Sequence, residues 1–278
     1  MAVELKKIDT EKRNERSMHI DSMSTLDMVK LINEEDHKVA EAVAEVTPEI
    51  AKAVDVIYEQ LRQGGRLVYV GAGTSGRLGI LDAAECPPTY GVDPGLVVGL
   101  IAGGPGALLK AVEGAEDSRV LGREDLEKIH FSAKDVVVGI AASGRTPYVL
   151  GAMDYAHSVG APVLALTCCH NSELSRHADI TMAPVPGPEV VTGSSRMKSG
   201  TAQKMVLNMI STSIMIQMGR VKGNRMVNMQ LTNKKLIDRG TRMIVDELGL
   251  DYDHANRLLL AYGSVKKAVD AYREENEK

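Results

Sequence analysis

The chain has 278 residues, of which 44% are hydrophobic and 25% charged, so it is long enough to bury a sizeable core. Its 33 Lys and Arg against 37 Asp and Glu give a net charge of -4, which argues against a nucleic-acid partner or a membrane surface. With no Trp and one Phe, the chain also lacks the stacking residues typical of single-strand nucleic-acid binders.

No signal for export or membrane insertion is visible. No apolar stretch reaches the length of a membrane span, and residues 1–16 lack the apolar core of a signal peptide. The three cysteines are too few and too awkwardly placed for a disulfide framework. We therefore expect a cytoplasmic protein.

The N-terminal part is predicted to be an arm followed by helices. Residues 1–23 are polar and aperiodic, and we expect them to be ordered only if they pack on a partner subunit. Apolar residues at helical spacing then predict three helices, at 25–33, 34–46 and 48–62.

The next part alternates between strands and helices. Apolar runs predict five strands, at 66–70, 96–101, 135–141, 162–167 and 179–184. Helical segments are predicted between them, at 75–84, 105–113, 117–129, 147–159 and 172–177. This alternation predicts an α/β fold with a doubly wound, parallel five-stranded sheet and right-handed crossovers.

The C-terminal part is predicted to be helical. A long helix at 197–218 carries methionines that suit a core or a subunit contact. Three short amphipathic helices follow, with breaks near Gly249 and Gly263. The predicted parts are an N-terminal arm with helices at 1–48, the sheet domain at 49–232 and a helical module at 233–278.

Two strand-to-helix turns carry the same tripeptide. Ser75-Gly76-Arg77 follows the first predicted strand, and Ser143-Gly144-Arg145 follows the third. Glycines let the backbone approach a ligand, while hydroxyls and the free N–H groups of a helix start attract anions. In a sheet ordered 2-1-3-4-5 these two strands are neighbours whose carboxyl ends flank the ligand crevice. The two turns are therefore predicted to face one phosphate.

The first turn matches neither common nucleotide motif. Its glycines have the spacing of a dinucleotide fold, but the acidic residue expected near position 90 is missing. No Gly-Lys-Ser/Thr follows, which excludes a nucleotide P-loop. A third cluster of hydroxyls, glycines and cations, at 192–201, opens the long helix.

Two glutamates are the acid–base candidates. Glu85 is predicted to end its helix, because Pro87 and Pro88 should not continue it. The negative end of the helix dipole would then favour the protonated carboxyl that a general acid needs. Glu116 precedes or begins a helix, where the positive end of the dipole favours the anion that a general base needs. The alternative is that Glu116 or Asp117 only caps that helix.

Other polar residues leave alternatives open. Cys168, Cys169 and His170 suggest a metal, but adjacent cysteines chelate one ion poorly and no second pair supports them. We therefore expect no metal site. Arg77 and Arg145 could either bind phosphate or pair with carboxylates across the turn.

Five segments share their order and spacing with one family. They are Gly71 to Arg77, Leu81 to Gly91, Val112 to Ser118, Ala141 to Tyr148 and Thr192 to Lys198. With them, the chain resembles the N-acetylmuramic acid 6-phosphate etherases, bacterial enzymes of the sugar isomerase (SIS) fold that are related to the glucokinase regulatory protein. The resemblance implies a lyase that converts N-acetylmuramic acid 6-phosphate into N-acetylglucosamine 6-phosphate and D-lactate in peptidoglycan recycling. It implies no metal or organic cofactor.

The resemblance also assigns roles to residues. The family's two catalytic glutamates fall on Glu85, as the acid that protonates the departing ether oxygen, and on Glu116, as the base that activates water. Which of them removes the proton from C2 of the sugar stays open. Sugar and phosphate contacts are carried over to Thr74, Ser75, Ser143, Gly144, Thr146, Ser194, Ser195, Arg196 and Lys198.

The chain departs from the family pattern at two places. Thr167 to Ser172 reads Thr-Cys-Cys-His-Asn-Ser where relatives carry an Asn-Pro-Gly-Ser-like turn, and the chain ends earlier than expected, at Lys278. The alternative functions are a sugar-phosphate isomerase of the same fold and a non-catalytic sugar-phosphate sensor. A homodimer is expected, because SIS folds commonly build the site across two subunits.

Overall fold

The computed structural model describes residues 9–110 and 112–276. Its α-helices are α1 Thr25–Glu45, α2 Thr47–Arg62, α3 Gly73–Tyr90, α4 Arg119–Lys128, α5 Pro147–Ser158, α6 Glu173–Arg176, α7 Lys198–Gln217, α8 Lys234–Leu248, α9 Tyr252–Tyr262 and α10 Val265–Asn276. The strands are β1 Leu67–Gly71, β2 Val97–Ile101, β3 Val136–Ile140, β4 Val163–Leu166, β5 Ile180–Met182, β6 Val221–Lys222 and β7 Arg225–Met226. Short 3-10 helices are η2 Asp9–Glu11, η3 Glu15–Ser17, η4 Ile20–Ser22 and η5 Pro105–Leu108.

The described chain divides into two compact units. The first holds residues 9–83 and 95–211, and the second holds 84–94 and 212–276. Helices α3 and α7 each begin in the first unit and end in the second. The predicted three-part division of the chain stays a prediction.

The first unit is built on the predicted five-stranded sheet. Its strands are all parallel and follow the order β2-β1-β3-β4-β5, which confirms the doubly wound α/β fold. Every residue of β1, β3 and β4 is buried, because helices cover both faces of the sheet. This explains why these strands appear in the sequence as continuous apolar runs rather than as alternating patterns.

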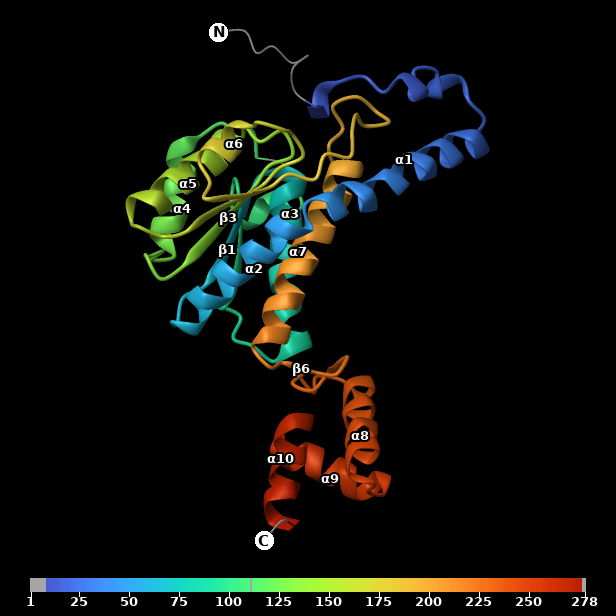
Figure 1. Ribbon diagram of the computed structural model, residues 1–278, viewed down its shortest axis with the longest axis vertical. Coiled ribbons are helices and arrows are strands. Elements are labelled where there is room, and N and C mark those ends of the chain that lie inside the picture. The colour runs from blue at the N-terminus through green and yellow to red at the C-terminus, as the bar shows by residue number, and fades with distance from the viewer. Residues whose placement is uncertain (1–8, 111, 277–278) are drawn as a thin grey trace. The chain divides into compact units, whose positions relative to one another are not determined.

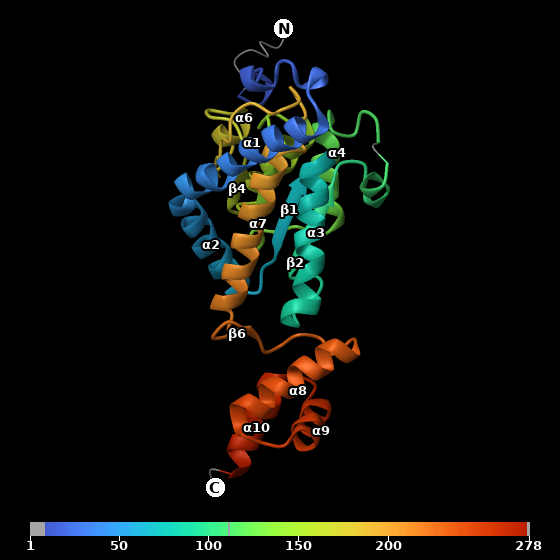
Figure 2. The same ribbon diagram turned by 90° about the vertical axis from the view of Figure 1, so that its right-hand side faces the viewer.

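Helices form a layer on each face of the sheet. Helices α4 and α5 lie on one face, and α2, α3 and α7 lie on the other (Figures 1 and 2). Leu126, Tyr148 and Met153 pack from the first layer into a core with Val68 and Val137 of the sheet. The predicted anion turns begin at the ends of β1 and β3, which the sheet and its two helical layers hold in place.

The N-terminal segment differs from its prediction. Residues 9–23 pack on loops of their own chain, whereas we expected order only against a partner subunit; residues 1–8 lie outside the described residues. Ser17 Oγ donates to the carbonyl oxygen of Val190 at 2.7 Å, and Asn14 Nδ2 donates to that of Pro188 at 3.3 Å. Each of these polar side chains satisfies a backbone carbonyl group of a distant loop.

Two predicted helices merge into one. Helix α1 runs without a break from Thr25 to Glu45, where the apolar spacing had suggested separate helices at 25–33 and 34–46. No Gly or Pro interrupts this stretch, so nothing stops backbone hydrogen bonding at position 34. Glu35, near the middle of the helix, is fully buried.

The second unit contains the three predicted C-terminal helices. Gly249 and Gly263 end α8 and α9 in the left-handed conformation, as the breaks in the sequence indicated. Ile244, Ala255 and Leu259 belong to a small apolar core of their own. The short hairpin of β6 and β7 was not predicted from the sequence.

Candidate active site

The two anion turns begin at neighbouring strand ends. The last residue of β1, Gly71, pairs with Ile140, the last residue of β3, so both turns leave the same edge of the sheet. The first turn opens α3, and the second leads into α5, where Thr146 is the N-cap residue. The sheet order thus brings the two Ser-Gly-Arg sequences to one edge, as predicted.

The third hydroxyl cluster reaches the same edge through hydrogen bonds. Cys168 N donates to the carbonyl oxygen of Ala142, next to the second turn, at 2.9 Å. Cys168 Sγ lies 3.6 Å from the carbonyl oxygen of Ser199, at the start of α7. Ser75 Oγ, in the first turn, donates to Gln203 Oε1 of α7 at 2.9 Å. The starts of α3 and α7 and the turn before α5 therefore form one polar region within the first unit.

Five predicted ligand hydroxyls in this region are available to a ligand. They are half-buried, and among the described residues they have no hydrogen-bond partner: Thr74, Ser143, Thr146, Ser194 and Ser195. Half-buried hydroxyls without partners, placed at helix starts, are suited to binding an anion.

Gly144 shapes the second turn. Its φ of +65° lies in the left-handed region, and a Cβ added there would lie 2.3 Å from Ser172 Cβ. Its carbonyl oxygen accepts a hydrogen bond from Leu174 N at 2.9 Å, which ties the turn to α6. Only glycine fits this position without strain.

A hollow of about 250 Å³ opens beside this turn. It is lined by Ser143, Arg145, Cys169, His170, Asn171, Ser172, Glu173 and Arg176. Arg145 makes no ion pair or hydrogen bond with any other described residue, so its charge is free to attract an anion. The loop Thr167 to Ser172, which departs from the family pattern, forms part of this wall.

Arg77 has a different task. Its Nε donates to the carbonyl oxygen of Leu108 at 2.9 Å, and its Nη2 donates to that of Ala107 at 2.8 Å. No carboxylate pairs with it among the described residues, so the predicted carboxylate alternative is wrong, and a phosphate contact stays a prediction. Arg77 instead holds the loop that follows β2.

Lys198 was predicted to contact the substrate, and the structure corrects this. Its Nζ lies 2.7 Å from Glu35 Oε2 and 3.0 Å from the carbonyl oxygen of Pro186, and its side chain is buried. An ammonium committed to these partners does not reach a ligand. Arg196, by contrast, is exposed.

Sequence reasoning missed the two carboxylates that hold the start of α7. Glu189 is fully buried and accepts hydrogen bonds from the backbone N–H groups of Lys198 and Ser199, each at 2.9 Å. This carboxylate satisfies two N–H groups of the first turn of α7, which would otherwise have no partner within the helix. Glu189 precedes the first residue of α7 by nine positions. An acidic residue that close to a helix start could have suggested this role, but the sequence does not show that the connecting loop folds back.

Glu35 is the second missed carboxylate. It accepts from Asn14, Arg16, Lys38 and Lys198. Burial pushes the pKa of Glu35 upward, but hydrogen bonds from Lys198 and Lys38 outweigh burial and lower the pKa to about 2. Glu35 is therefore an anion at neutral pH and fixes the N-terminal segment, α1 and α7 together.

Glu85 lies inside α3 and not at its end. The helix continues through Pro87 and Pro88 to Tyr90, and Gly91 N donates to the carbonyl oxygen of Pro87 at 2.9 Å. Each proline removes one N–H group, but the helical hydrogen bonds resume after them. The predicted helix end is wrong, and with it the dipole argument for an acid. The side chain of Glu85 is exposed and has no partner among the described residues.

Glu116 lies in the turn before α4. The cap of α4 is Ser118, whose Oγ accepts from Leu121 N at 3.2 Å, so the capping alternative for Glu116 is wrong. The carbonyl oxygen of Glu116 accepts from Tyr148 N, in the first turn of α5, at 2.9 Å. Its carboxylate is exposed and without a partner among the described residues. Glu116 is thus fastened to the helix that follows the second anion turn.

The cysteines of the neighbouring loop are packing residues. Burial raises the pKa of the Cys168 thiol well above its usual value, so the thiol stays protonated and is a poor metal ligand. Across the described residues, no group of three or more His, Cys, Asp or Glu is arranged to hold a metal ion.

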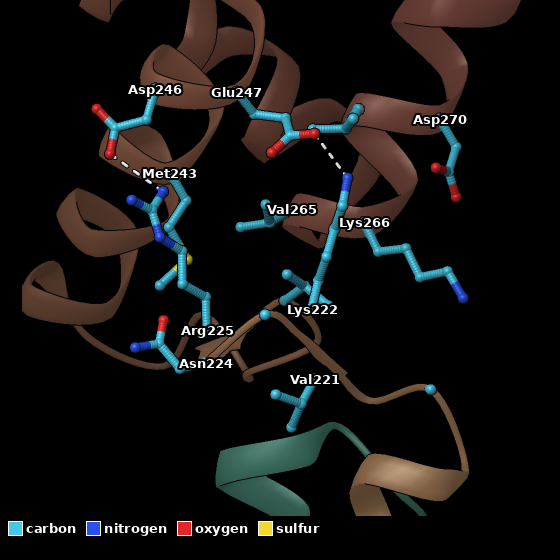
Figure 3. A pocket seen from close by; sticks show the side chains of 14 residues that line it. Val221, Lys222, Asn224, Arg225, Met243, Asp246, Glu247, Val265, Lys266 and Asp270 are labelled. Atoms are coloured by element: carbon cyan, nitrogen blue, oxygen red, sulfur yellow. Dashed lines mark hydrogen bonds and ion pairs between the residues drawn. The ribbon is translucent and has the colours of Figure 1, made fainter.

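A larger hollow, of about 650 Å³, lies in the second unit (Figure 3). Four of its charged side chains form two ion pairs: Lys222 Nζ lies 2.6 Å from Glu247 Oε1, and Arg225 Nη1 lies 3.1 Å from Asp246 Oδ2. No hydroxyl side chain lines it. Lys266 and Asp270 also line it, without an ion pair among the described residues. Because no described residue offers a hydroxyl donor to its walls, we do not assign the sugar phosphate to it.

Comparisons with known proteins agree with this fold. The family model for the glucokinase regulatory protein N-terminal SIS domain matches residues 49–157, and the SIS domain model matches residues 124–213. A phosphoheptose isomerase from Neisseria gonorrhoeae superposes with a TM-score of 0.56 at 19% identity, over 69% of this chain and 98% of that one. A phosphoheptose isomerase from Francisella tularensis gives a TM-score of 0.54 at 21% identity, over 70% of this chain and 100% of that one. The sheet and its turns thus define an SIS-domain protein.

Sequence relatives narrow this class to one family. N-acetylmuramic acid 6-phosphate etherase 1 of Vibrio cholerae is 57% identical over 263 residues, which are 95% of this chain and 88% of the relative. N-acetylmuramic acid 6-phosphate etherase of Bacteroides fragilis is 58% identical over 254 residues, 91% of this chain and 90% of the relative. The chain belongs to the family of N-acetylmuramic acid 6-phosphate etherases.

Proposed function

We propose that this chain cleaves the D-lactyl ether of N-acetylmuramic acid 6-phosphate, giving N-acetylglucosamine 6-phosphate and D-lactate. The identity of 57% to an etherase over 95% of the chain is the observation that carries this function. The enzyme is therefore a carbon–oxygen lyase that serves peptidoglycan recycling. The proposal needs no metal or organic cofactor.

The sugar phosphate is proposed to bind where the three hydroxyl clusters meet. Ser143 and Thr146 precede α5, a helix of 12 residues whose N-terminal N–H groups and dipole attract an anion. Arg145 adds an unpaired cation at the same turn. Thr74, Ser194 and Ser195 are proposed to bind the remaining oxygens of the phosphate and the sugar hydroxyls.

The reaction is proposed to proceed by elimination and hydration. The ring-opened sugar presents an aldehyde that acidifies the C2 proton, and a base removes this proton. The electron pair then forms the C2–C3 double bond and breaks the bond from C3 to the ether oxygen. Glu85 protonates that oxygen, so D-lactate leaves. Water, activated by Glu116, adds to C3, and a proton returns to C2.

The two glutamates have different support for these roles. Glu116 precedes the start of α4 and is hydrogen-bonded through its carbonyl oxygen to the first turn of α5. Its side chain is exposed and has no partner among the described residues, so it is accessible to substrate and to water. Glu85 is exposed and unpaired among the described residues, so it is accessible to substrate, but its acid role rests on the family.

Assembly and location are proposed alongside the activity. Apolar side chains of Leu26 and Val29 on α1 and Met209 on α7 are exposed, which leaves surface for a second copy. We therefore propose a homodimer, which light scattering would test. None of the described helices is long and apolar enough to cross a membrane. We propose that the enzyme acts in the cytoplasm.

The activity is tested by incubating the purified protein with N-acetylmuramic acid 6-phosphate and measuring D-lactate. In deuterated water, we expect one deuterium at C2 of the product, because hydration returns a solvent proton to that carbon. Unphosphorylated N-acetylmuramic acid serves as the control. A product that is an isomer of the substrate, without lactate, would favour the isomerase alternative; binding without turnover would favour the sensor.

A further inference from the structure

A buried hydrogen bond joins the first anion turn to α7. Ser75 Oγ donates to Gln203 Oε1 at 2.9 Å. Ser75 is 7% exposed and Gln203 is 1% exposed. Their helices approach closely at this point, because a Cβ added to Gly200 would lie 3.3 Å from the Thr74 methyl group. The pair therefore lies at the junction of two of the three hydroxyl clusters.

The other half of the Gln203 carboxamide is unsatisfied. Among the described residues, Gln203 Nε2 is a buried side-chain nitrogen with no hydrogen-bond partner. Leaving a buried donor unpaired costs about 1–3 kcal/mol. Such groups are rare in folded proteins, so each of them calls for an explanation.

The hydrogen bond also conflicts with the predicted contact between Ser75 and the sugar phosphate. A hydroxyl has one hydrogen, and phosphate oxygens need donors. While that hydrogen points to Gln203 Oε1, Ser75 cannot donate to phosphate. The Ser75 hydroxyl can therefore donate to an anion only if it no longer donates its hydrogen to Gln203 Oε1.

A rotation of the amide resolves both problems. The oxygen and nitrogen of a carboxamide have nearly the same size, and the terminal torsion of Gln has broad minima with roughly two-fold symmetry. Turning the group by about 180° would place Nε2 where Oε1 now accepts. Nε2 would then donate to Ser75 Oγ. The Ser75 hydrogen would then be free. Gln203 Oε1 would take the position that Nε2 has now, and an unpaired carbonyl oxygen costs less free energy there than an unpaired N–H group.

We propose that Gln203 is a positioning residue for the Ser75 hydroxyl: its carboxamide turns over when the phosphate of the sugar binds, so that Gln203 donates to Ser75 and Ser75 donates to phosphate. The inference rests on the proposed function, because it takes the substrate phosphate as the anion at α3. Successive hydrogen bonds polarise one another, so the N–H of Gln203 strengthens donation by Ser75.

The test is a double-mutant cycle with Gln203→Met and Ser75→Ala. Calorimetry measures the dissociation constant of N-acetylglucosamine 6-phosphate, the product, for all four proteins. Gln203→Met is expected to weaken binding about fivefold when Ser75 is present, because the Ser75 hydroxyl loses the donor that orients it and a neutral hydrogen bond is worth about 1 kcal/mol. In the Ser75→Ala protein it is expected to change binding less than about twofold, because no hydroxyl remains to be positioned.

A second variant separates positioning from packing. Gln203→Glu keeps the shape of the side chain but only accepts hydrogen bonds when ionised, so it would hold the Ser75 hydrogen and repel phosphate. It is expected to bind the product more weakly than Gln203→Met. Gln60→Met, the same substitution on α2, is the control, and thermal unfolding shows whether each variant is folded.

The outcomes separate this inference from the proposed function. Equal effects of Gln203→Met with and without Ser75, or product binding unchanged in both Gln203 variants, would overturn the positioning role while leaving the etherase intact. A wild-type protein that binds no sugar phosphate and releases no D-lactate would overturn the proposed function, and the inference with it.

Discussion

The ammonium of Lys198 lies 2.7 Å from the Oε2 atom of Glu35, and both side chains are about 1% exposed. This buried ion pair joins the first residue of α7 to the middle of α1. Arg16 and Lys38 contact the other carboxylate oxygen, Oε1. Three elements of the chain are therefore held by one carboxylate.

Replacing Lys198 by Met should destabilise the protein. Removing one partner of a buried ion pair costs about 3–5 kcal/mol, and we expect a loss near 3 kcal/mol because two cations remain beside Glu35. Urea unfolding measures this loss, with Lys204→Met as the control at an exposed position of the same helix. The folded variant should bind N-acetylglucosamine 6-phosphate as the wild type does. A binding loss beyond tenfold in a folded variant would restore Lys198 as a direct ligand.

Acid should weaken the same network. The pKa of Glu35 is lowered to about 2 from an ordinary value of 4.5, so the folded state favours its anion. That contribution is fully present above about pH 4.5 and is lost as the pH falls towards 2. We expect the unfolding free energy of Glu35→Gln to fall less between pH 5 and pH 3 than that of the wild type. Parallel pH curves for the two proteins would contradict the lowered pKa.

Gly144→Ala should disturb the second anion turn. The position has a φ of +65°, and the new methyl group would collide with Ser172. Gly187→Ala is the matched control, because Gly187 has a φ of +79° but no atom within 4 Å of an added Cβ. We expect about 1–2 kcal/mol of strain in both variants. Gly144→Ala should lose more stability than Gly187→Ala, because only its methyl group collides with a neighbour. Calorimetry should also show that Gly144→Ala, unlike Gly187→Ala, binds the product more weakly.

Glu85→Gln and Glu116→Gln should each slow the release of D-lactate. General acid or base catalysis contributes about 10²–10⁴-fold, so losses in kcat of that order are expected with little change in product affinity. Glu113→Gln, an exposed neighbour of Glu116, should keep full activity. A rate untouched by either catalytic substitution would remove that glutamate from the mechanism.

Hydrogen exchange at C2 then identifies the base. If Glu116 removes the C2 proton, Glu85→Gln should still exchange the C2 hydrogen of the substrate with deuterated water, because deprotonation precedes loss of the ether oxygen. Glu116→Gln should not exchange it. NMR measures this exchange. The reverse pattern would show that Glu85, and not Glu116, removes the C2 proton.

The sheet and its neighbouring turns could be predicted because their signals are local. Buried parallel strands appear as continuous apolar runs, as in β1 and β3, and Gly249 and Gly263 end their helices through their own backbone conformations. The prediction at Pro87 and Pro88 failed although it was local. A proline inside a helix removes a hydrogen bond and crowds the carbonyl group four residues before it, but α3 still continues through Pro87 and Pro88 to Tyr90.

The sequence by itself determined the order of strands and helices, the two Ser-Gly-Arg turns and the family to which the chain belongs. Only the tertiary structure decided which side chains are free to meet a substrate. Lys198 is paired with a carboxylate 163 positions away, and the Ser75 hydroxyl with an amide 128 positions away. Such partners leave no local pattern, because hydrogen bonds between distant segments depend on how the segments pack and not on their own composition.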